Sequence, residues 1–181
     1  KTSACNLASA PKQNFEMQVP FEVIDGRIYV QARVNQRGPF RFAVDTGASG
    51  QARADSTLVT ALGLEIEKPI ANSDGVKTAE VDTTRLASVE VGGLSRENLH
   101  VITRDYNSKM SPESALSGML AREFFSEGLL IIDYPKKTLS LAVRLRFRTS
   151  KRAFSSTSVH FAFLFLSQAC MLMEISTRGL T

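Results

Sequence analysis

The sequence predicts an all-β domain with one or two short helices, on three observations. Short stretches of alternating apolar and polar residues fill residues 21–145, and turn signals rich in Gly, Pro and Asn separate them at short intervals. The chain has 181 residues, of which 43% are hydrophobic and 22% are charged, which suits one globular domain. Many short strands with regular turns are typical of a β-barrel or β-sandwich.

The first two strands are predicted at residues 28–34 and 40–44. Apolar side chains alternate with polar ones in both segments, as expected of half-buried strands. Residues 35–39 contain Gly and Pro and turn the chain between them. The two segments therefore form a hairpin whose second strand leads directly into Asp45.

Further hairpins are predicted along the chain. Gly92-Gly93 turns the chain between apolar positions at 86–91 and 99–101, and residues 134–137 do the same between 129–133 and 138–142. Asn72-Ser73-Asp74-Gly75 is a turn signal between two weaker strands.

Two short helices are predicted among these strands. Residues 55–62 form the first, capped by Asp55 or Ser56 and ended by Gly63, and residues 121–126 suggest one further helical turn. Residues 105–116 are predicted to be a polar loop.

The charge pattern argues against a nucleic-acid-binding domain. The net charge is +4, but residues 144–181 carry six basic residues and one acid, which leaves 16 basic and 17 acidic residues in 1–143. The basic character therefore belongs to the end of the chain. With only Cys5, Cys170, His100 and His160 as soft ligands and no C-x-x-C motif, we expect no metal and no cofactor.

The two ends of the chain have a different character from the domain predicted over residues 21–145. We interpret 1–20 as an N-terminal extension and 146–181 as a basic, then apolar tail. The apolar run at 159–173 is shorter than the roughly 20 residues a spanning helix needs. We expect a helix packed on the domain or on a dimer partner, with a membrane-surface segment and a segment foreign to the fold as alternatives.

Membrane association would use residues 159–173 or a lipid anchor at Cys5. The start at Lys1 indicates either a processed protein or a fragment, and the small polar residues that follow favour a periplasmic, envelope-associated or secreted protein.

The strongest chemical signal is Val44-Asp45-Thr46-Gly47-Ala48-Ser49. A strand carries the carboxylate of Asp45 into a turn of small residues, and Gly47 and Ala48 let another chain approach closely. Two carboxylates held that close cannot both ionise, so one can accept a proton from water while the other donates one. This is the arrangement that hydrolysis by a pair of aspartates requires.

Residues 21–145 resemble the retropepsin-like aspartic peptidases, in particular single-domain bacterial members. The resemblance rests on the motif around Asp45, on Ala61-Leu62-Gly63-Leu64, on the hairpin at 86–93, and on a second motif at Ser117-Gly118-Met119-Leu120-Ala121 followed by Ile131-Ile132-Asp133-Tyr134. It implies a single-lobe acid-protease barrel that cleaves peptide or protein substrates as a homodimer. Alanine at position 121 replaces the glycine usual in the second motif, which raises the question of how that methyl group fits.

The resemblance also implies roles for individual residues. Asp45 would be the catalytic carboxylate, Thr46 would hydrogen-bond across the dimer axis, and Gly47 and Ala48 would support the active loop. Gly118, Met119, Leu120 and Ala121 would form the second motif. A flap covering the substrate would lie near Ser73, Asp74 and Gly75.

A homodimer also follows from counting motifs. Asp-Thr-Gly occurs once, whereas a two-lobed enzyme would supply two aspartates from a chain of about twice this length. Asp82-Thr83-Thr84 lacks the glycine, and Asp133 precedes a turn. One aspartate per chain can meet a second only across a two-fold axis, where the residue meets its own copy.

Two other functions compete with this interpretation. Gly47-Ala48-Ser49-Gly50-Gln51 approaches the Gly-x-Ser-x-Gly motif of serine hydrolases, but it lacks the final glycine and the expected α/β context. A catalytically idle binding or interaction module with the same fold is the second alternative. His100 is expected to be an edge or surface residue.

Overall fold

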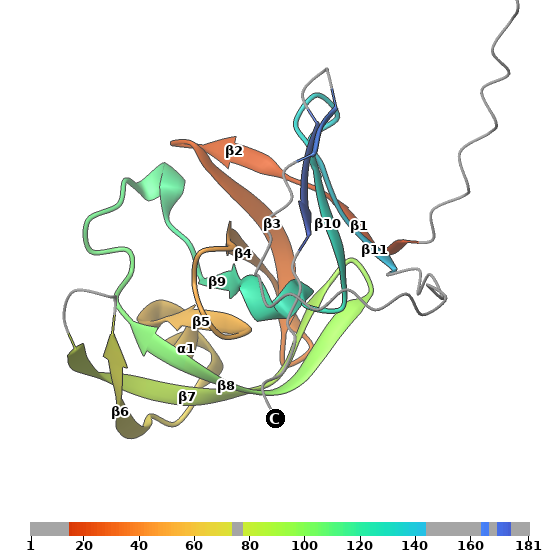
Figure 1. Ribbon diagram of the computed structural model, residues 1–181. Coiled ribbons are helices and arrows are strands. Elements are labelled where there is room, and N and C mark those ends of the chain that lie inside the picture. The colour runs from red at the N-terminus through yellow and green to blue at the C-terminus, as the bar shows by residue number, and fades with distance from the viewer. Residues whose placement is uncertain (1–14, 74–77, 144–163, 167–169, 175–181) are drawn as a thin grey trace, which may run out of the picture.

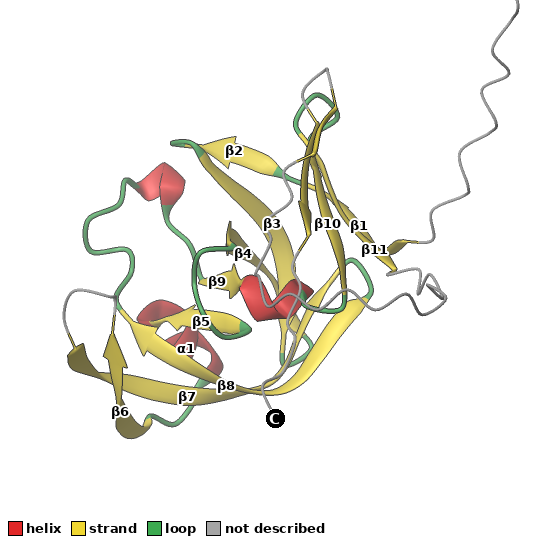
Figure 2. Cartoon of the chain, viewed as in Figure 1, coloured by secondary structure: helices red, strands yellow, loops and turns green. Residues whose placement is uncertain are grey.

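The structure is a computed structural model that describes residues 15–73, 78–143, 164–166 and 170–174. Strands dominate these residues, which confirms the all-β class (Figure 2). They form two sheets, accompanied within the described residues by one α-helix and two short 3-10 helices.

The larger sheet has eight strands in the order β2-β3-β4-β9-β5-β8-β7-β6. β3 also pairs with β7, which closes the strands from β3 round to β7 into a barrel (Figure 1). Its strands are β2 (Glu22–Ile24), β3 (Arg27–Val34), β4 (Arg37–Asp45), β5 (Ala52–Asp55), β6 (Glu67–Ser73), β7 (Thr78–Val91), β8 (Leu94–Arg104) and β9 (Gly118–Ala121).

The smaller sheet has the order β1-β11-β10-β13-β12. Its strands are β1 (Phe15–Pro20), β10 (Gly128–Asp133), β11 (Thr138–Val143), β12 (Leu164–Leu166) and β13 (Cys170–Glu174). The sequence interpretation placed residues 1–20 outside the domain, but β1 pairs along β11 and Met17 is only 1% exposed. The folded domain therefore begins before residue 21.

The expected helix in the apolar tail is wrong where the structure describes it. Residues 164–166 and 170–174 are strands, and the backbone of β13 pairs antiparallel with β10. An apolar run satisfies a helix and a buried strand equally, and here the free edge of β10 supplies backbone partners. Residues 144–163, 167–169 and 175–181 lie outside the described residues. The described part of the chain contains no helix long and apolar enough to cross a membrane.

Hydrophobic side chains from the inner faces of the strands fill the barrel. Every second residue of β3 is buried in this core, as its alternation predicts, and the large fully buried side chains there include Phe42, Leu86, Leu99, Leu120, Phe124 and Phe125. The predicted hairpins β3–β4, β7–β8 and β10–β11 are all present. The barrel thus provides a rigid support for the loops that join its strands.

The predicted first helix is α1 (Ser56–Leu62), and Asp55 is its cap. Oδ1 of Asp55 accepts hydrogen bonds from the Thr57 backbone N–H at 2.9 Å and the Thr57 hydroxyl at 2.6 Å. Gly63 ends the helix in a left-handed conformation (φ 65°), which glycine adopts easily. The second helical turn is the 3-10 helix Arg122–Phe125, and another 3-10 turn, Pro112–Ser114, lies within the predicted polar loop.

Candidate active site

The structure brings the two sequence motifs together on neighbouring strands. β9, which carries the second motif, lies between β4 and β5, the two strands joined by the loop after Asp45. β4 and β9 run parallel, and their register pairs Ala43 with Met119, Val44 with Leu120 and Asp45 with Ala121. Two motifs more than 70 residues apart in sequence therefore form one structural unit at the end of β4.

Backbone hydrogen bonds from Ala121 and the 3-10 helix that follows it hold the loop after Asp45. The N–H groups of Ala121, Arg122 and Glu123 donate to the carbonyls of Gln51, Ala48 and Gly50, at 2.9, 3.1 and 3.0 Å. Three consecutive donors therefore fix both halves of the loop. Because these bonds involve backbone groups alone, the sequence gives no direct sign of them.

The carboxylate of Asp45 is fixed by the small residues that follow it. Oδ1 accepts hydrogen bonds from the backbone N–H groups of Gly47 at 3.1 Å and Ala48 at 3.2 Å. A Cβ atom added at Gly47 would lie 3.3 Å from Oδ1, so glycine leaves room for this turn. Oδ2 accepts no hydrogen bond from the described residues, and Asp45 is half-buried. One oxygen is thus oriented while the other is available for an external partner.

The alanine at position 121 is accommodated without disturbing the loop. Ala121 is fully buried, and its N–H still donates to the carbonyl of Gln51. The position where close approach does demand glycine is Gly118. A Cβ atom there would lie 2.5 Å from the carbonyl oxygen of Arg53 and 2.6 Å from Cε1 of Phe42.

A second, smaller apolar cluster covers the face of the sheet on which Asp45 lies. Tyr29 pairs with Ala43, which pairs with Met119, and all three share the face of Asp45 because it follows Ala43 by two residues. Tyr29 is buried, and its hydroxyl donates to the carbonyl of Ser114 at 2.8 Å. The sequence pattern placed Tyr29 on the polar side of its strand. A large aromatic residue at such a position was the available signal for a second buried face.

The predicted flap region is a hairpin in the described residues. β6 and β7 pair antiparallel up to Ser73 and Thr78, while Asp74 and Gly75 lie outside the described residues. The structure therefore shows the hairpin, and its role as a flap stays a prediction.

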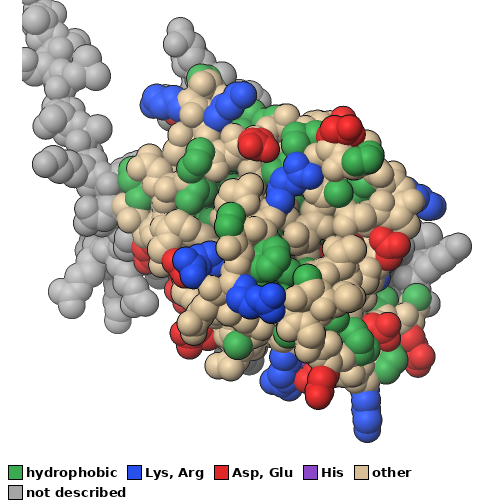
Figure 3. All heavy atoms as spheres, turned by 180° about the vertical axis from the view of Figure 1, so that it is seen from behind, with side chains coloured by type: hydrophobic (Ala, Val, Ile, Leu, Met, Phe, Trp, Pro, Cys, Tyr) green, Lys and Arg blue, Asp and Glu red, His purple; other side chains and the backbone are tan. Residues whose placement is uncertain are grey.

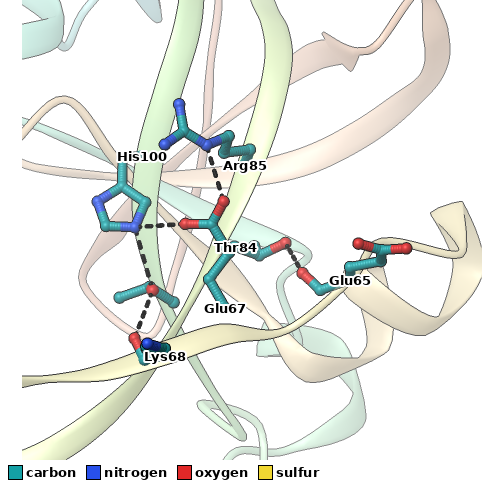
Figure 4. Close-up of polar contacts among 7 residues, drawn as sticks. Glu65, Glu67, Lys68, Thr84, Arg85 and His100 are labelled. Atoms are coloured by element: carbon teal, nitrogen blue, oxygen red, sulfur yellow. Dashed lines mark hydrogen bonds and ion pairs between the residues drawn. The ribbon is translucent and has the colours of Figure 1, made fainter.

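A polar network crosses the base of this hairpin (Figure 4). Glu67 of β6 accepts from Nε of Arg85 at 2.7 Å and lies 2.9 Å from Nε2 of His100. Further along, the Thr84 hydroxyl donates to the carbonyl of Glu65 at 2.7 Å. The hydrogen bond from Arg85 is the main reason that the pKa of Glu67 is lowered, and the nearby Arg85 and His100 lower it further.

The serine-hydrolase alternative finds no support in this geometry. Ser49 lies in the exposed part of the loop, while His100 contacts Glu67 and Thr83 on a different part of the sheet. His160 lies outside the described residues. Within the described residues, no three His, Cys, Asp or Glu side chains gather in a way that could hold a metal ion.

The strands that carry both motifs lie in a region that matches a known protein family. Residues 30–124, more than half of the chain, match the model of the aspartyl protease family. The chain belongs to the aspartyl protease family. The matched region contains Asp45 and the whole of the second motif.

A crystal structure of a retropepsin-like aspartic protease from Rickettsia conorii is similar at 20% sequence identity, covering 74% of this chain and 97% of that one, with a TM-score of 0.45. No curated protein matches the chain.

Proposed function

We propose that the protein is an aspartic endopeptidase whose active site forms when the Asp45 residues of two subunits meet. The observation that supports this most directly is the state of the Asp45 carboxylate. It is held by two backbone N–H groups through one oxygen, and no described residue bonds the other. A carboxylate oriented in this way is suited to bind a water molecule or a second carboxylate.

The reaction needs both carboxylates in different protonation states. One ionised Asp45 accepts a proton from water as the water oxygen attacks the carbonyl carbon of the peptide bond. The other, protonated Asp45 donates its proton to the carbonyl oxygen, which gives a neutral gem-diol. Transfer of a proton to the amide nitrogen then allows the C–N bond to break. The two products are a carboxylic acid and an amine.

Each part of the loop has a role in this proposal. Gly47 and Ala48 hold Asp45 through their N–H groups, and three backbone hydrogen bonds from the end of the second motif and the 3-10 helix after it hold the loop. Thr46 lies beside Asp45 and would hydrogen-bond to its copy across the two-fold axis. The β6–β7 hairpin would cover a bound peptide.

Replacement of Asp45 by Asn tests the proposal. Asn keeps an oxygen that can accept the two backbone hydrogen bonds, so the fold should be retained while the acid–base chemistry is lost. We expect the wild-type chain to cleave a reduced and alkylated protein at acidic pH, and Asp45→Asn to be at least about 10³-fold slower. Urea unfolding of both proteins is the control for folding.

Other outcomes would contradict the proposal in distinct ways. Equal cleavage rates for the two proteins would mean that the activity does not use Asp45. If neither protein cleaves any of a set of unfolded substrates between pH 3 and pH 7, the catalytically idle binding module becomes the better description.

A further inference from the structure

A groove lies away from the loop that carries Asp45. It runs between α1 and the β7–β8 ladder, and its volume is about 800 Å³. This falls in the range of 300–1,000 Å³ typical of sites that bind small groups. Val59, Leu64 and Ile66 contribute apolar lining, and Ile66 is 52% exposed.

A buried hydroxyl without a partner lies in the wall of this groove. Thr103 is only 4% exposed, and its Oγ1 makes no hydrogen bond with any described residue. An unsatisfied buried hydroxyl costs free energy and is rare in folded proteins. Oγ1 of Thr103 is covered in this conformation, and rotation about χ1 would turn it toward the groove, where it would receive a hydrogen bond from a ligand.

Carboxylates surround this hydroxyl because of the strand register. Asp82 pairs directly with Thr103 across the β7–β8 ladder, which places their Cβ atoms about 5 Å apart on one face. Glu80 and Asp105 lie two residues from Asp82 and Thr103 and also line the groove. Arg104 is the one basic residue in the lining, and its guanidinium stacks on the ring of Tyr106 at 4.8 Å.

Acidic and hydrophobic side chains lie next to one another at this end of the molecule. Figure 3 shows them, together with Lys and Arg side chains, at the lower right, the end of the molecule that holds β6 and β7. A ligand that fits must therefore combine an apolar stem with a positive charge that can donate hydrogen bonds. A lysine side chain has this composition: four methylene groups and an ammonium group with three donors.

We propose that this groove is an exosite that binds a lysine side chain of the protein substrate. The alkyl stem lies against Val59, Leu64 and Ile66, and the ammonium group donates to Oγ1 of Thr103 and the carboxylate of Asp82. Lysine binding follows from the groove alone. The statement that the lysine belongs to a substrate rests on the proposed peptidase function.

The groove is distinct from the active loop because the two lie on opposite faces of the same strands. Thr103 is next to Ala54, Ala54 is next to Gly118, and Gly118 is next to Phe42, whose side chain is in the core. Asp45 follows Phe42 by three residues and so has the opposite orientation. No residue of the loop 45–51 lines the groove, so a lysine bound there does not contact that loop.

Binding can be measured without cleavage by using the full chain with Asp45→Asn. The probe is the peptide acetyl-Ala-Ala-Lys-Ala-Ala-amide, and its partner contains norleucine, which keeps the stem and lacks the ammonium group. We expect the lysine peptide to bind about tenfold more tightly by calorimetry. Failure of this test leaves the Asp45 proposal standing, because the measurement does not involve catalysis.

Variants identify where the peptide binds. Asp82→Asn and the similarly shaped Thr103→Val should each weaken lysine-peptide binding severalfold. Glu97→Gln, which removes an exposed carboxylate from β8 outside the groove, should leave it unchanged. Equal affinity for the lysine and norleucine peptides, or equal effects of Asp82→Asn and Glu97→Gln, would overturn the proposal. Binding of n-butylamine as tight as that of the peptide would assign the groove to free amines instead of a protein.

Discussion

At the scale of single residues, Gly118 shows why the second motif begins with glycine. Its neighbours leave no space for a methyl group, since the carbonyl of Arg53 is backbone and cannot rotate away. We expect Gly118→Ala to lower the free energy of unfolding by about 1–3 kcal/mol, because the overpacked strands must separate slightly. Urea unfolding followed by circular dichroism measures this change.

Gly26→Ala is the matched control for this prediction. Gly26 has a left-handed backbone (φ 72°), but nothing lies within 4 Å of an added Cβ atom. Alanine at this position lowers the free energy of unfolding only because it disfavours a left-handed backbone, by about 1 kcal/mol. If Gly118→Ala is no more destabilising than Gly26→Ala, close packing is not the reason for glycine at position 118.

Asp55 illustrates how far a local sequence signal extends. The sequence predicted a cap at Asp55 or Ser56, and the hydrogen bonds to Thr57 show that Asp55 is the cap. The structure adds a second contact, because Oδ2 accepts the N–H of Tyr106 at 2.7 Å. A contact across 51 residues depends on the parallel pairing of β5 with β8, which no local pattern shows.

At the scale of elements, the base of the β6–β7 hairpin is tied to the barrel by Glu67. The lowered pKa of this carboxyl means that its contacts stabilise the fold while it is ionised. That stabilisation is fully present when the pH is above the ordinary pKa of a glutamate, near 4.5. It is lost as the pH falls through the lowered pKa of Glu67. Acid therefore weakens the attachment of the hairpin.

The pH dependence of Glu67→Gln tests this attachment. We expect the variant to be less stable than wild type at pH 7, and the difference to shrink as the pH falls below about 4. Thermal unfolding between pH 7 and pH 3 measures it. Glu65→Gln is the control, because the side chain of Glu65 makes no hydrogen bond or ion pair with the described residues, and its difference from wild type should not change with pH. A difference for Glu67→Gln that stays constant with pH would refute the prediction.

The elements that could be predicted from sequence are those whose partners are close along the chain. The hairpins, α1 and the 3-10 turn after the second motif all have turn or cap signals within a few residues. β1 was missed because its partner β11 lies more than 100 residues away, and β13 because an apolar run fits a helix as well as a strand. The insertion of β9 between β4 and β5 is also non-local, and only the family resemblance linked the two motifs.

At the scale of the whole molecule, the barrel supplies one Asp45 per chain. In the described residues this carboxylate has two backbone donors and no second carboxylate beside it. The proposed chemistry requires two, so activity must depend on association of two chains. A chain with Asp45→Asn can still associate but brings no functional carboxylate to the shared site.

Mixing wild type with Asp45→Asn turns this requirement into a measurement. If subunits exchange freely between equal amounts of the two proteins, about a quarter of the dimers contain two wild-type chains. Because adding the variant doubles the total number of dimers, the activity should fall to about half of that of the wild type alone. A larger excess of the variant should suppress the activity further. Wild type added in place of the variant is the control and should raise the rate. Mass spectrometry of isotope-labelled chains shows separately that subunits exchange. If subunits exchange during a long incubation and the variant still leaves the activity unaffected, each chain acts alone. The shared site of two Asp45 carboxylates would then be wrong.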